Sequence, residues 1–170
     1  MTPHAMKSGG SQEYGTPPEL FNFLNRRFLF DYDPFAALDN AMPTEWVSTI
    51  EGTYHMGPHG ALLNVSYRDG FNFPWDNRRV FFNPPYKPTG ILARTVEKAI
   101  EERERAEIIV GIFPVDTSVA WWHRLRQFAH LEPLVGRPAF IDKATGLPRK
   151  GSTVPIVVAQ FYPPLDAWRR

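Results

Sequence analysis

The chain has 170 residues, enough for one domain with its own core, and it contains no cysteine. Disulfides, zinc–thiolate sites, iron–sulfur clusters and a cysteine nucleophile are therefore excluded, and we expect a cytoplasmic protein. No apolar run approaches the roughly 18 residues of a membrane span, so no membrane partner is expected. Residues 1–120 hold 11 Lys and Arg against 15 Asp and Glu, a net of −4, whereas residues 121–170 hold 8 against 3, a net of +5. Two interpretations stay open, a scatter of charges on a solvated surface and a basic rim that faces a polyanion.

The amino-terminal segment predicts a tail followed by a helix. Residues 1–13 are polar and carry glycine, so we expect a disordered tail ahead of one domain over residues 14–170. The sequence Thr-Pro-Pro-Glu at 16–19 predicts a helix start, with Thr16 as the hydroxyl cap and a proline in the first turn. The apolar residues that follow extend this helix to about Arg27.

Short apolar runs alternate with helical patterns along the rest of the chain. Strands are expected at 28–32, 80–82, 108–113, 131–135, 139–141 and 153–161. Helices are expected over 92–100 and after a cap at Thr117. This alternation predicts an α/β fold with a mainly parallel sheet, to which a closing hairpin adds an antiparallel edge.

Four residues that follow the 80–82 strand carry the clearest chemistry: Asn83, Pro84, Pro85 and Tyr86. Ligands of open α/β sheets bind at the carboxyl ends of strands, and the prolines make this segment rigid. The Asn83 side-chain oxygen and the Pro84 carbonyl can then accept both hydrogens of a planar amino group, which keeps the nitrogen lone pair available for attack. Tyr86 offers a flat face on which a base can stack. The alternative is a rigid turn that ends a strand and buries a tyrosine.

Asn-Pro-Pro-Tyr after an apolar strand resembles the catalytic motif of S-adenosylmethionine-dependent amino methyltransferases, chiefly those that act on adenine. The segments at 14–21 and 30–37 resemble the opening of phage-type (Dam-like) DNA N-6-adenine methyltransferases, and those at 113–123 and 136–140 fall in that family's order. The resemblance covers about residues 14–161. It implies a single Rossmann-like methyltransferase domain that moves a methyl group from S-adenosylmethionine to the amino group of a flipped-out adenine in DNA.

The resemblance also implies roles for individual residues. Asn83 and Pro84 would hold the target amino group, Pro85 belongs to the same motif, and Tyr86 would stack on the adenine. The residues implied to bind the cofactor are Tyr14, Thr16, Pro17, Asp33, Pro34, Phe35, Asp69 and Phe71. Each has a plainer alternative: Thr16 as a helix cap, Asp33 as the end of a strand, and Asp69 in an ordinary turn.

The cofactor motif departs from its relatives at one point. In relatives of this Asp-Pro-Phe motif a glycine-rich turn usually follows. Here Asp33-Pro34-Phe35 continues Ala-Ala-Leu-Asp, and no glycine occurs between Phe35 and Gly52. A second function class therefore stays open, a DNA-binding module that keeps the fold without binding the cofactor. RNA adenine and protein glutamine methyltransferases also use Asn-Pro-Pro-Tyr, and they remain alternatives within the same enzyme class.

The last feature is a basic loop in the positively charged third of the chain. Arg137, Lys143, Arg149 and Lys150 lie around a predicted Gly-Leu-Pro turn, as a loop that grips DNA phosphates or as a solvated hairpin. No metal is implied, because the His55 and His59 pair lacks an obvious carboxylate partner. The recognition sequence and the oligomeric state are not encoded in any recognisable pattern.

Overall fold

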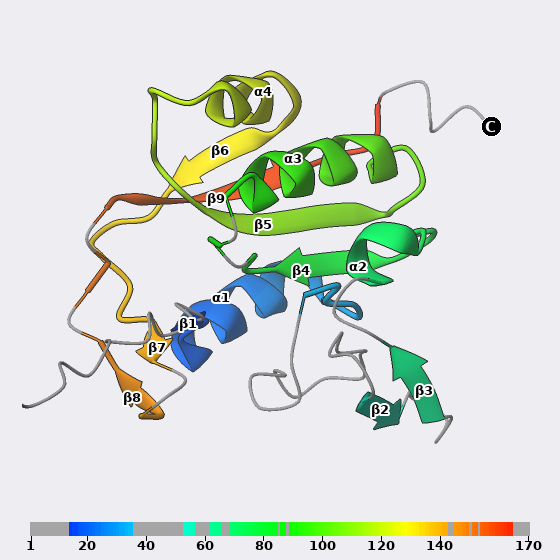
Figure 1. Ribbon diagram of the computed structural model, residues 1–170, viewed down its shortest axis with the longest axis horizontal. Coiled ribbons are helices and arrows are strands. Elements are labelled where there is room, and N and C mark those ends of the chain that lie inside the picture. The colour runs from blue at the N-terminus through cyan, green and yellow to red at the C-terminus, as the bar shows by residue number, and fades with distance from the viewer. Residues whose placement is uncertain are drawn as a thin grey trace, which may run out of the picture.

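The computed structural model describes residues 14–35, 53–56, 62–65, 69–84, 86–87, 89–142, 145–149, 151–152 and 154–164. The expected tail over residues 1–13 lies outside this part of the chain. A four-stranded sheet forms the centre of the fold, with helices on both of its faces (Figure 1). Its strands are β4 (Arg79–Phe82), β5 (Ile108–Pro114), β6 (His130–Pro133) and β9 (Ile156–Phe161).

The central sheet is mixed, with the order β4-β5-β9-β6. β4 and β5 are parallel, whereas β9 runs antiparallel to both β5 and β6. Tyr32 adds a parallel bridge to Val80 on the outer side of β4. The expectation of a mainly parallel sheet is corrected on this point, because β9 is inserted antiparallel between β5 and β6. Apolar runs such as 108–113 report burial on both faces, which does not fix strand direction.

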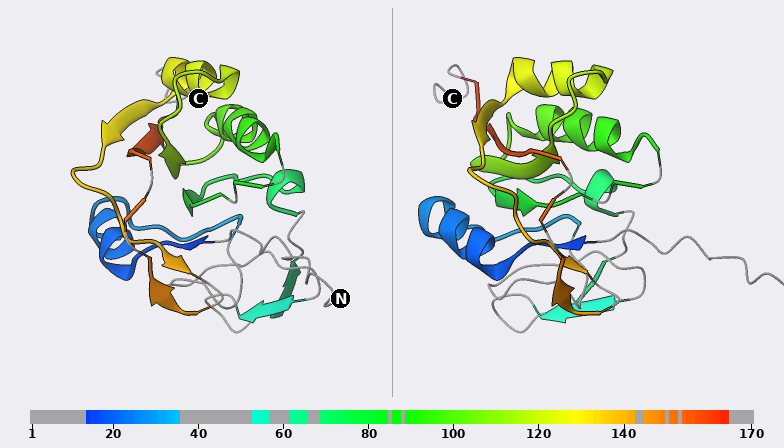
Figure 2. Two further views of the ribbon diagram at one scale, coloured as in Figure 1. Left: turned by 60° about the vertical axis from the view of Figure 1, so that its left-hand side comes forward. Right: turned by 90° about the vertical axis from the view of Figure 1, so that its left-hand side faces the viewer.

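Three long helices cover the sheet, and they divide the core into two clusters. α1 (Pro18–Phe28) packs on one face through Phe21, Leu24 and Phe28. α3 (Ile91–Glu102) and α4 (Ala120–Phe128) pack on the opposite face, as Figure 2 shows from the side. Alternate residues of β4, β5 and β9 point into the two clusters, as the two-residue period of a strand requires.

Two smaller antiparallel sheets and one helical turn complete the described structure. β1 (Tyr14–Gly15), β7 (Ile141–Asp142) and β8 (Leu147–Pro148) form a three-stranded sheet in the order β1-β7-β8. β2 (Thr53–Met56) pairs with β3 (Leu62–Val65), and α2 (Asp69–Asn72) is a single turn ahead of β4. The basic hairpin therefore joins β7 to β8 and pairs with β1, and it is not an added edge of the central sheet.

Several predicted elements are confirmed, whereas one strand and two helix caps are wrong and the strand expected at 139–141 is shifted to β7 (Ile141–Asp142). β4, β5, α3 and α4 occur where the sequence predicts them. The strand expected at 28–32 is reduced to the Tyr32 bridge, because α1 runs to Phe28 and Leu29 turns the chain with a left-handed φ of 53°. Thr16 and Thr117 do not cap helices: Pro17 and Val119 occupy the cap positions, without side-chain cap hydrogen bonds.

Candidate active site

Asn83 directly follows β4 at its carboxyl end, at the edge of the central sheet. Its side chain is half-buried, and its Nδ2 donates a hydrogen bond of 3.0 Å to the backbone carbonyl of Tyr14 in β1. A carbonyl oxygen can only accept, so this bond assigns the amino half of the Asn83 amide to Tyr14. The amide oxygen of Asn83 therefore lies on the other side of the carboxamide group, available as an acceptor.

The residues after Asn83 lie in low-polarity surroundings. Pro84 is buried, Tyr86 is partly buried, and Pro85 lies outside the described residues. Burial raises the pKa of the Tyr86 phenol to about 12, because desolvation disfavours the phenolate. Tyr86 is therefore neutral at physiological pH, with a ring suited to contact with an uncharged aromatic base.

Tyr14 lies in β1 beside Asn83, and Thr16 and Pro17 connect β1 to α1. Thr16 and Pro17 are buried, and the Thr16 side chain is 8% exposed. Because Tyr14 is bonded to the Asn83 side chain, this segment adjoins the Asn-Pro-Pro-Tyr motif. The sequence resemblance placed these segments at one site, and the structure brings the Asn83 side chain into contact with the Tyr14 backbone.

The Asp-Pro-Phe segment makes a tight turn against α2. The Asp33 carboxylate accepts a 2.9 Å hydrogen bond from the Phe35 backbone N–H, which closes the turn around Pro34. Gly70 of α2 approaches so closely that a Cβ atom there would lie 2.1 Å from the Pro34 carbonyl oxygen. Only glycine permits this contact, so the two segments predicted to meet the cofactor pack directly on each other. The Asp69 side chain lies outside the described residues.

A chain of aromatic rings connects this turn to β4. The Phe35 ring centroid lies 4.9 Å from that of Phe71 and 5.6 Å from that of Phe82, which precedes Asn83. The guanidinium of Arg94, an exposed residue of α3, lies 4.1 Å from the centroid of the Phe71 ring. A ligand ring that stacks on this side of Phe71 would therefore take the place of Arg94.

Two buried residues that the sequence analysis did not single out hold α2 in place. Trp75 is fully buried, and its Nε1 donates to the carbonyl of Gly70 at 3.1 Å. The Trp75 backbone N–H donates in turn to Glu102 Oε2 at 2.9 Å. Glu102 is also fully buried, although the sequence places it in a run of charges that is typical of a solvated helix end. Nothing in that local pattern distinguishes it from its exposed neighbours.

The four basic residues predicted to meet DNA are only partly described. Lys143 and Lys150 lie outside the described residues. Arg137 donates a 3.4 Å hydrogen bond to the Ser152 carbonyl. Arg149 is half-exposed, but its guanidinium contacts Tyr14 and forms an ion pair with Asp142 at 3.2 Å. Arg149 therefore lies next to the amino-terminal segment of the candidate site.

Neither a metal centre nor a membrane span is found in the part of the chain that the structure describes. No group of three or more His, Cys, Asp or Glu side chains there could hold a metal ion. No helix among these residues is long and apolar enough to cross a bilayer. The side chains of His55 and His59 lie outside the part of the chain that the structure describes.

Comparison with known proteins gives a family match over nearly the whole chain. The family model described as DNA N-6-adenine-methyltransferase (Dam) matches residues 5–164. A DNA N-6-adenine-methyltransferase of Escherichia phage T1 is 29% identical over 140 residues, which cover 75% of this chain and 58% of the relative. The chain thus spans somewhat more than half the length of that curated relative. No solved structure matches the chain.

Proposed function

The chain belongs to the DNA N-6-adenine-methyltransferase (Dam) family, and we propose that it transfers a methyl group from S-adenosylmethionine to the exocyclic amino group of adenine in DNA. The observation that carries this proposal is the hydrogen bond from Asn83 Nδ2 to the Tyr14 carbonyl. It leaves the Asn83 amide oxygen as an acceptor at a strand end, and the carbonyl of the next residue, Pro84, would be the second acceptor. Two acceptors match the two hydrogens of an adenine amino group.

In this proposal the chain acts mainly by positioning. Asn83 and Pro84 would each accept one hydrogen bond from the amino group, which leaves the nitrogen lone pair directed at the methyl donor. The neutral Tyr86 ring would stack on the adenine, which must leave the duplex because its nitrogen cannot reach a buried donor from within the base stack. Fixed dipoles at this point stabilise the charge that develops on the nitrogen during transfer.

The residues beside Asn83 would hold S-adenosylmethionine, which when bound would supply the methyl group as a sulfonium. Tyr14, Thr16 and Pro17 adjoin Asn83, and the Asp33-Pro34-Phe35 turn packs on Gly70 and Phe71. We assign the methionine end of the cofactor to the Thr16 and Asp33 segments and its adenine to Asp69 and Phe71. The close contact of Gly70 with Pro34 brings the two segments assigned to the cofactor together, although no glycine-rich turn follows Phe35.

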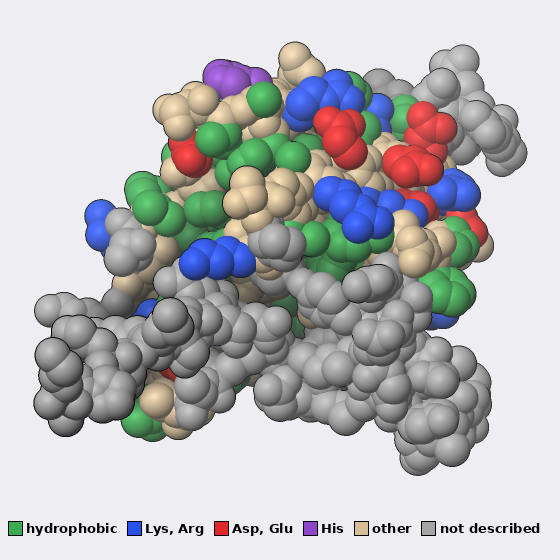
Figure 3. Space-filling view, viewed as in Figure 1, with side chains coloured by type: hydrophobic (Ala, Val, Ile, Leu, Met, Phe, Trp, Pro, Cys, Tyr) green, Lys and Arg blue, Asp and Glu red, His purple; other side chains and the backbone are tan. Residues whose placement is uncertain are grey.

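We further propose a Rossmann-like methyltransferase domain over residues 14–170, with the basic hairpin as the surface that meets DNA. Two features support this fold proposal: helices cover both faces of the sheet, and Tyr32, β4 and β5 are parallel neighbours. On the face that Figure 3 shows, Lys and Arg side chains alternate with Asp and Glu over α3 and α4 and form no single basic patch. Residues 121–170 carry the net charge of +5, and we propose Arg137, Lys143 and Lys150 among them as the phosphate contacts.

The product of the reaction distinguishes the proposed activity from its alternatives. The proposal is tested by incubating the protein with methyl-labelled S-adenosylmethionine and unmethylated duplex DNA, followed by nucleoside analysis. Label in N6-methyladenine is expected. Label in cytosine, in RNA alone or in protein would overturn the choice of substrate. A protein that binds DNA but gives no calorimetric signal with S-adenosylmethionine would instead be a DNA-binding module without the cofactor.

A further inference from the structure

The β1-β7-β8 sheet connects the Asn-Pro-Pro-Tyr motif to the basic hairpin. We propose that Arg149 is a positioning residue of the methyltransferase: its guanidinium fixes Tyr14, and the Tyr14 carbonyl orients the catalytic amide of Asn83. The hairpin would thus set the geometry of the reaction site from a distance. This inference rests on the proposed function, because a positioning residue presupposes the reaction. The contacts that carry it all lie within the chain itself.

The first link joins Asn83 to β1. Asn83 Nδ2 donates to the Tyr14 carbonyl at 3.0 Å, across 69 positions of sequence. Rotation of the amide by half a turn would set its oxygen against the Tyr14 carbonyl oxygen, where two acceptors repel each other. The position of the Tyr14 backbone therefore decides where the Asn83 oxygen lies and which way it faces.

The second link joins Tyr14 to Arg149. Arg149 Nη1 donates to the Tyr14 hydroxyl, and the guanidinium carbon lies 5.3 Å from the centroid of the Tyr14 ring. Arg149 Nε lies 3.2 Å from Asp142 Oδ2, and Asp142 is the strand partner of Tyr14 in the pairing of β1 with β7. One guanidinium therefore contacts both members of a strand pair.

The third link fixes Arg149 itself within the hairpin. Its backbone N–H donates to the Phe140 carbonyl at 2.9 Å, directly beyond β8. The pairing of Ile141 with Pro148 and of Asp142 with Leu147 holds the two arms of the hairpin together. Figure 1 shows β1 and β7 side by side with β8 beyond them. Arg149 is thus held at a defined place from which it reaches Tyr14.

This role differs from the phosphate contact that the sequence predicted for Arg149. A phosphate contact depends mainly on charge, so lysine can replace arginine there, and losing it lowers the slope of log affinity against log salt by about 0.9. The contacts with Tyr14 and Asp142 need the planar, forked guanidinium, which lysine lacks. Arg149→Ala and Arg149→Lys therefore separate the two roles.

The kinetic test measures the single-turnover rate of methyl transfer at saturating S-adenosylmethionine and DNA. Arg149→Ala, Arg149→Lys and Tyr14→Phe should each lower the rate by on the order of tenfold, because a small displacement of a positioned group slows a reaction strongly. The salt dependence of DNA binding should stay that of the parent. Arg126→Ala removes the same charge from an exposed position of α4 and should keep the parent rate.

A double-mutant cycle tests whether Arg149 acts through Tyr14. If it does, Arg149→Ala adds little to a protein that already carries Tyr14→Phe, because both changes remove the bond between the guanidinium and the Tyr14 hydroxyl. Independent roles would instead multiply the two losses. A full parent rate in Arg149→Lys, together with a lower salt slope in Arg149→Ala, would make Arg149 a phosphate contact and overturn the inference.

The side-chain amide of Asn83 gives a readout that needs neither DNA nor turnover. Its two ¹H–¹⁵N signals are identified by their loss in Asn83→Ala. We expect them to shift in Arg149→Ala and Tyr14→Phe and to stay in place in Arg126→Ala. Unmoved signals in the first two variants would overturn the inference, even if the parent methylates DNA. Shifted signals in a parent that transfers no methyl group would refute the proposed function alone.

Discussion

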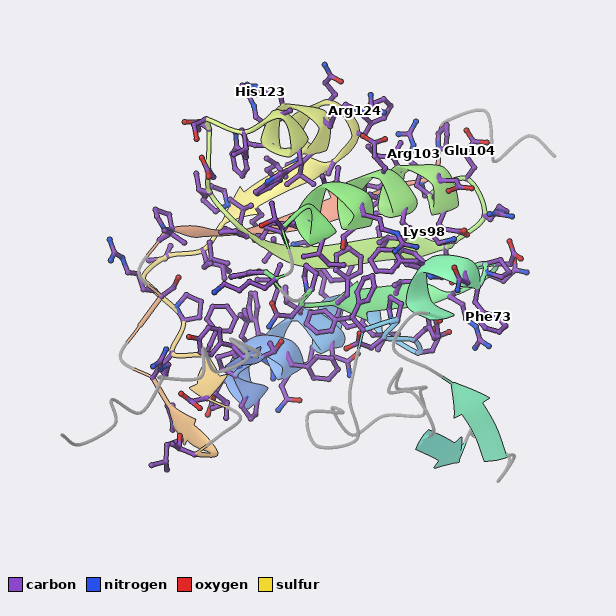
Figure 4. All side chains as sticks on the ribbon, in the orientation of Figure 1. Phe73, Lys98, Arg103, Glu104, His123 and Arg124 are labelled. Atoms are coloured by element: carbon purple, nitrogen blue, oxygen red, sulfur yellow. The ribbon has the colours of Figure 1, made fainter. Side chains whose placement is uncertain are left out.

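Replacing Glu102 by alanine should destabilise the protein strongly, because this carboxylate is buried and bonded on both of its oxygens. Glu102 is fully buried in α3, and its Oε1 lies 2.5 Å from Lys98 Nζ and 2.9 Å from Arg105 Nη2. Its Oε2 accepts the Trp75 backbone N–H. Figure 4 shows Lys98 on the side of α3 that faces α2, where its Nζ lies 5.8 Å from the centroid of the Trp75 ring.

The expected cost follows from what the alanine leaves behind. Lys98, whose side chain is only 10% exposed, and the Trp75 N–H would both lose their acceptor. Removing one partner of a buried ion pair costs about 3–5 kcal/mol in free energy of unfolding. This figure includes the cost of leaving buried donors without an acceptor. Because the free energy of unfolding of a domain is about 5–15 kcal/mol, Glu102→Ala should remove a large part of it.

The assay is equilibrium unfolding in urea, with Glu97→Ala as the matched control. Glu97 lies on the same helix and pairs with Arg124 at 2.9 Å, but both side chains are about half-exposed. Solvent screens such an exposed pair, so it contributes little to stability. Equal small losses in Glu102→Ala and Glu97→Ala would refute the reasoning, since they would show that Glu102 is not an anchor of the Trp75 segment.

Three further predictions concern the site itself. Gly70→Ala should weaken S-adenosylmethionine binding and lower stability, because its Cβ would meet the Pro34 carbonyl oxygen at 2.1 Å; calorimetry and urea unfolding measure the two effects. Asp33→Ala should weaken cofactor binding in a folded protein, and an unchanged calorimetric affinity would make this carboxylate purely structural. Burial raises the pKa of Tyr86 to about 12, so the folded protein keeps a phenol proton that the unfolded chain releases near pH 10. The stability that this adds is complete below about pH 10 and is lost as the pH rises towards 12, and Tyr86→Phe should remove that part of the alkaline loss of unfolding free energy.

Local patterns were sufficient for the elements that carry the motif. The apolar run 80–82, which ends at Asn83, and the helical spacing over 92–100 both predict elements that the structure contains. Such patterns report burial and period, and these two properties depend on neighbouring residues in the sequence. The direction of β9 depends on which strands lie beside it, which no local pattern records.

The contacts that the sequence analysis missed join residues that are far apart in the sequence. Glu102 bonds to Trp75 across 27 positions, and Asn83 bonds to Tyr14 across 69. Arg149 reaches Tyr14 across 135 positions, so its pattern in the sequence resembled an exposed basic loop. A charge run looks the same whether its members face water or a buried partner, and only the folded chain distinguishes the two.

The most direct test of the account is the amount of N6-methyladenine formed in DNA by the parent protein and by Asn83→Ala in one single-turnover experiment. Because Asn83 would supply one of the two acceptors for the adenine amino group, the variant should react about a hundredfold more slowly or worse. Its affinity for S-adenosylmethionine should remain that of the parent. A variant that forms N6-methyladenine at the parent rate would contradict the central claim, that Asn83 holds the amino group during methyl transfer.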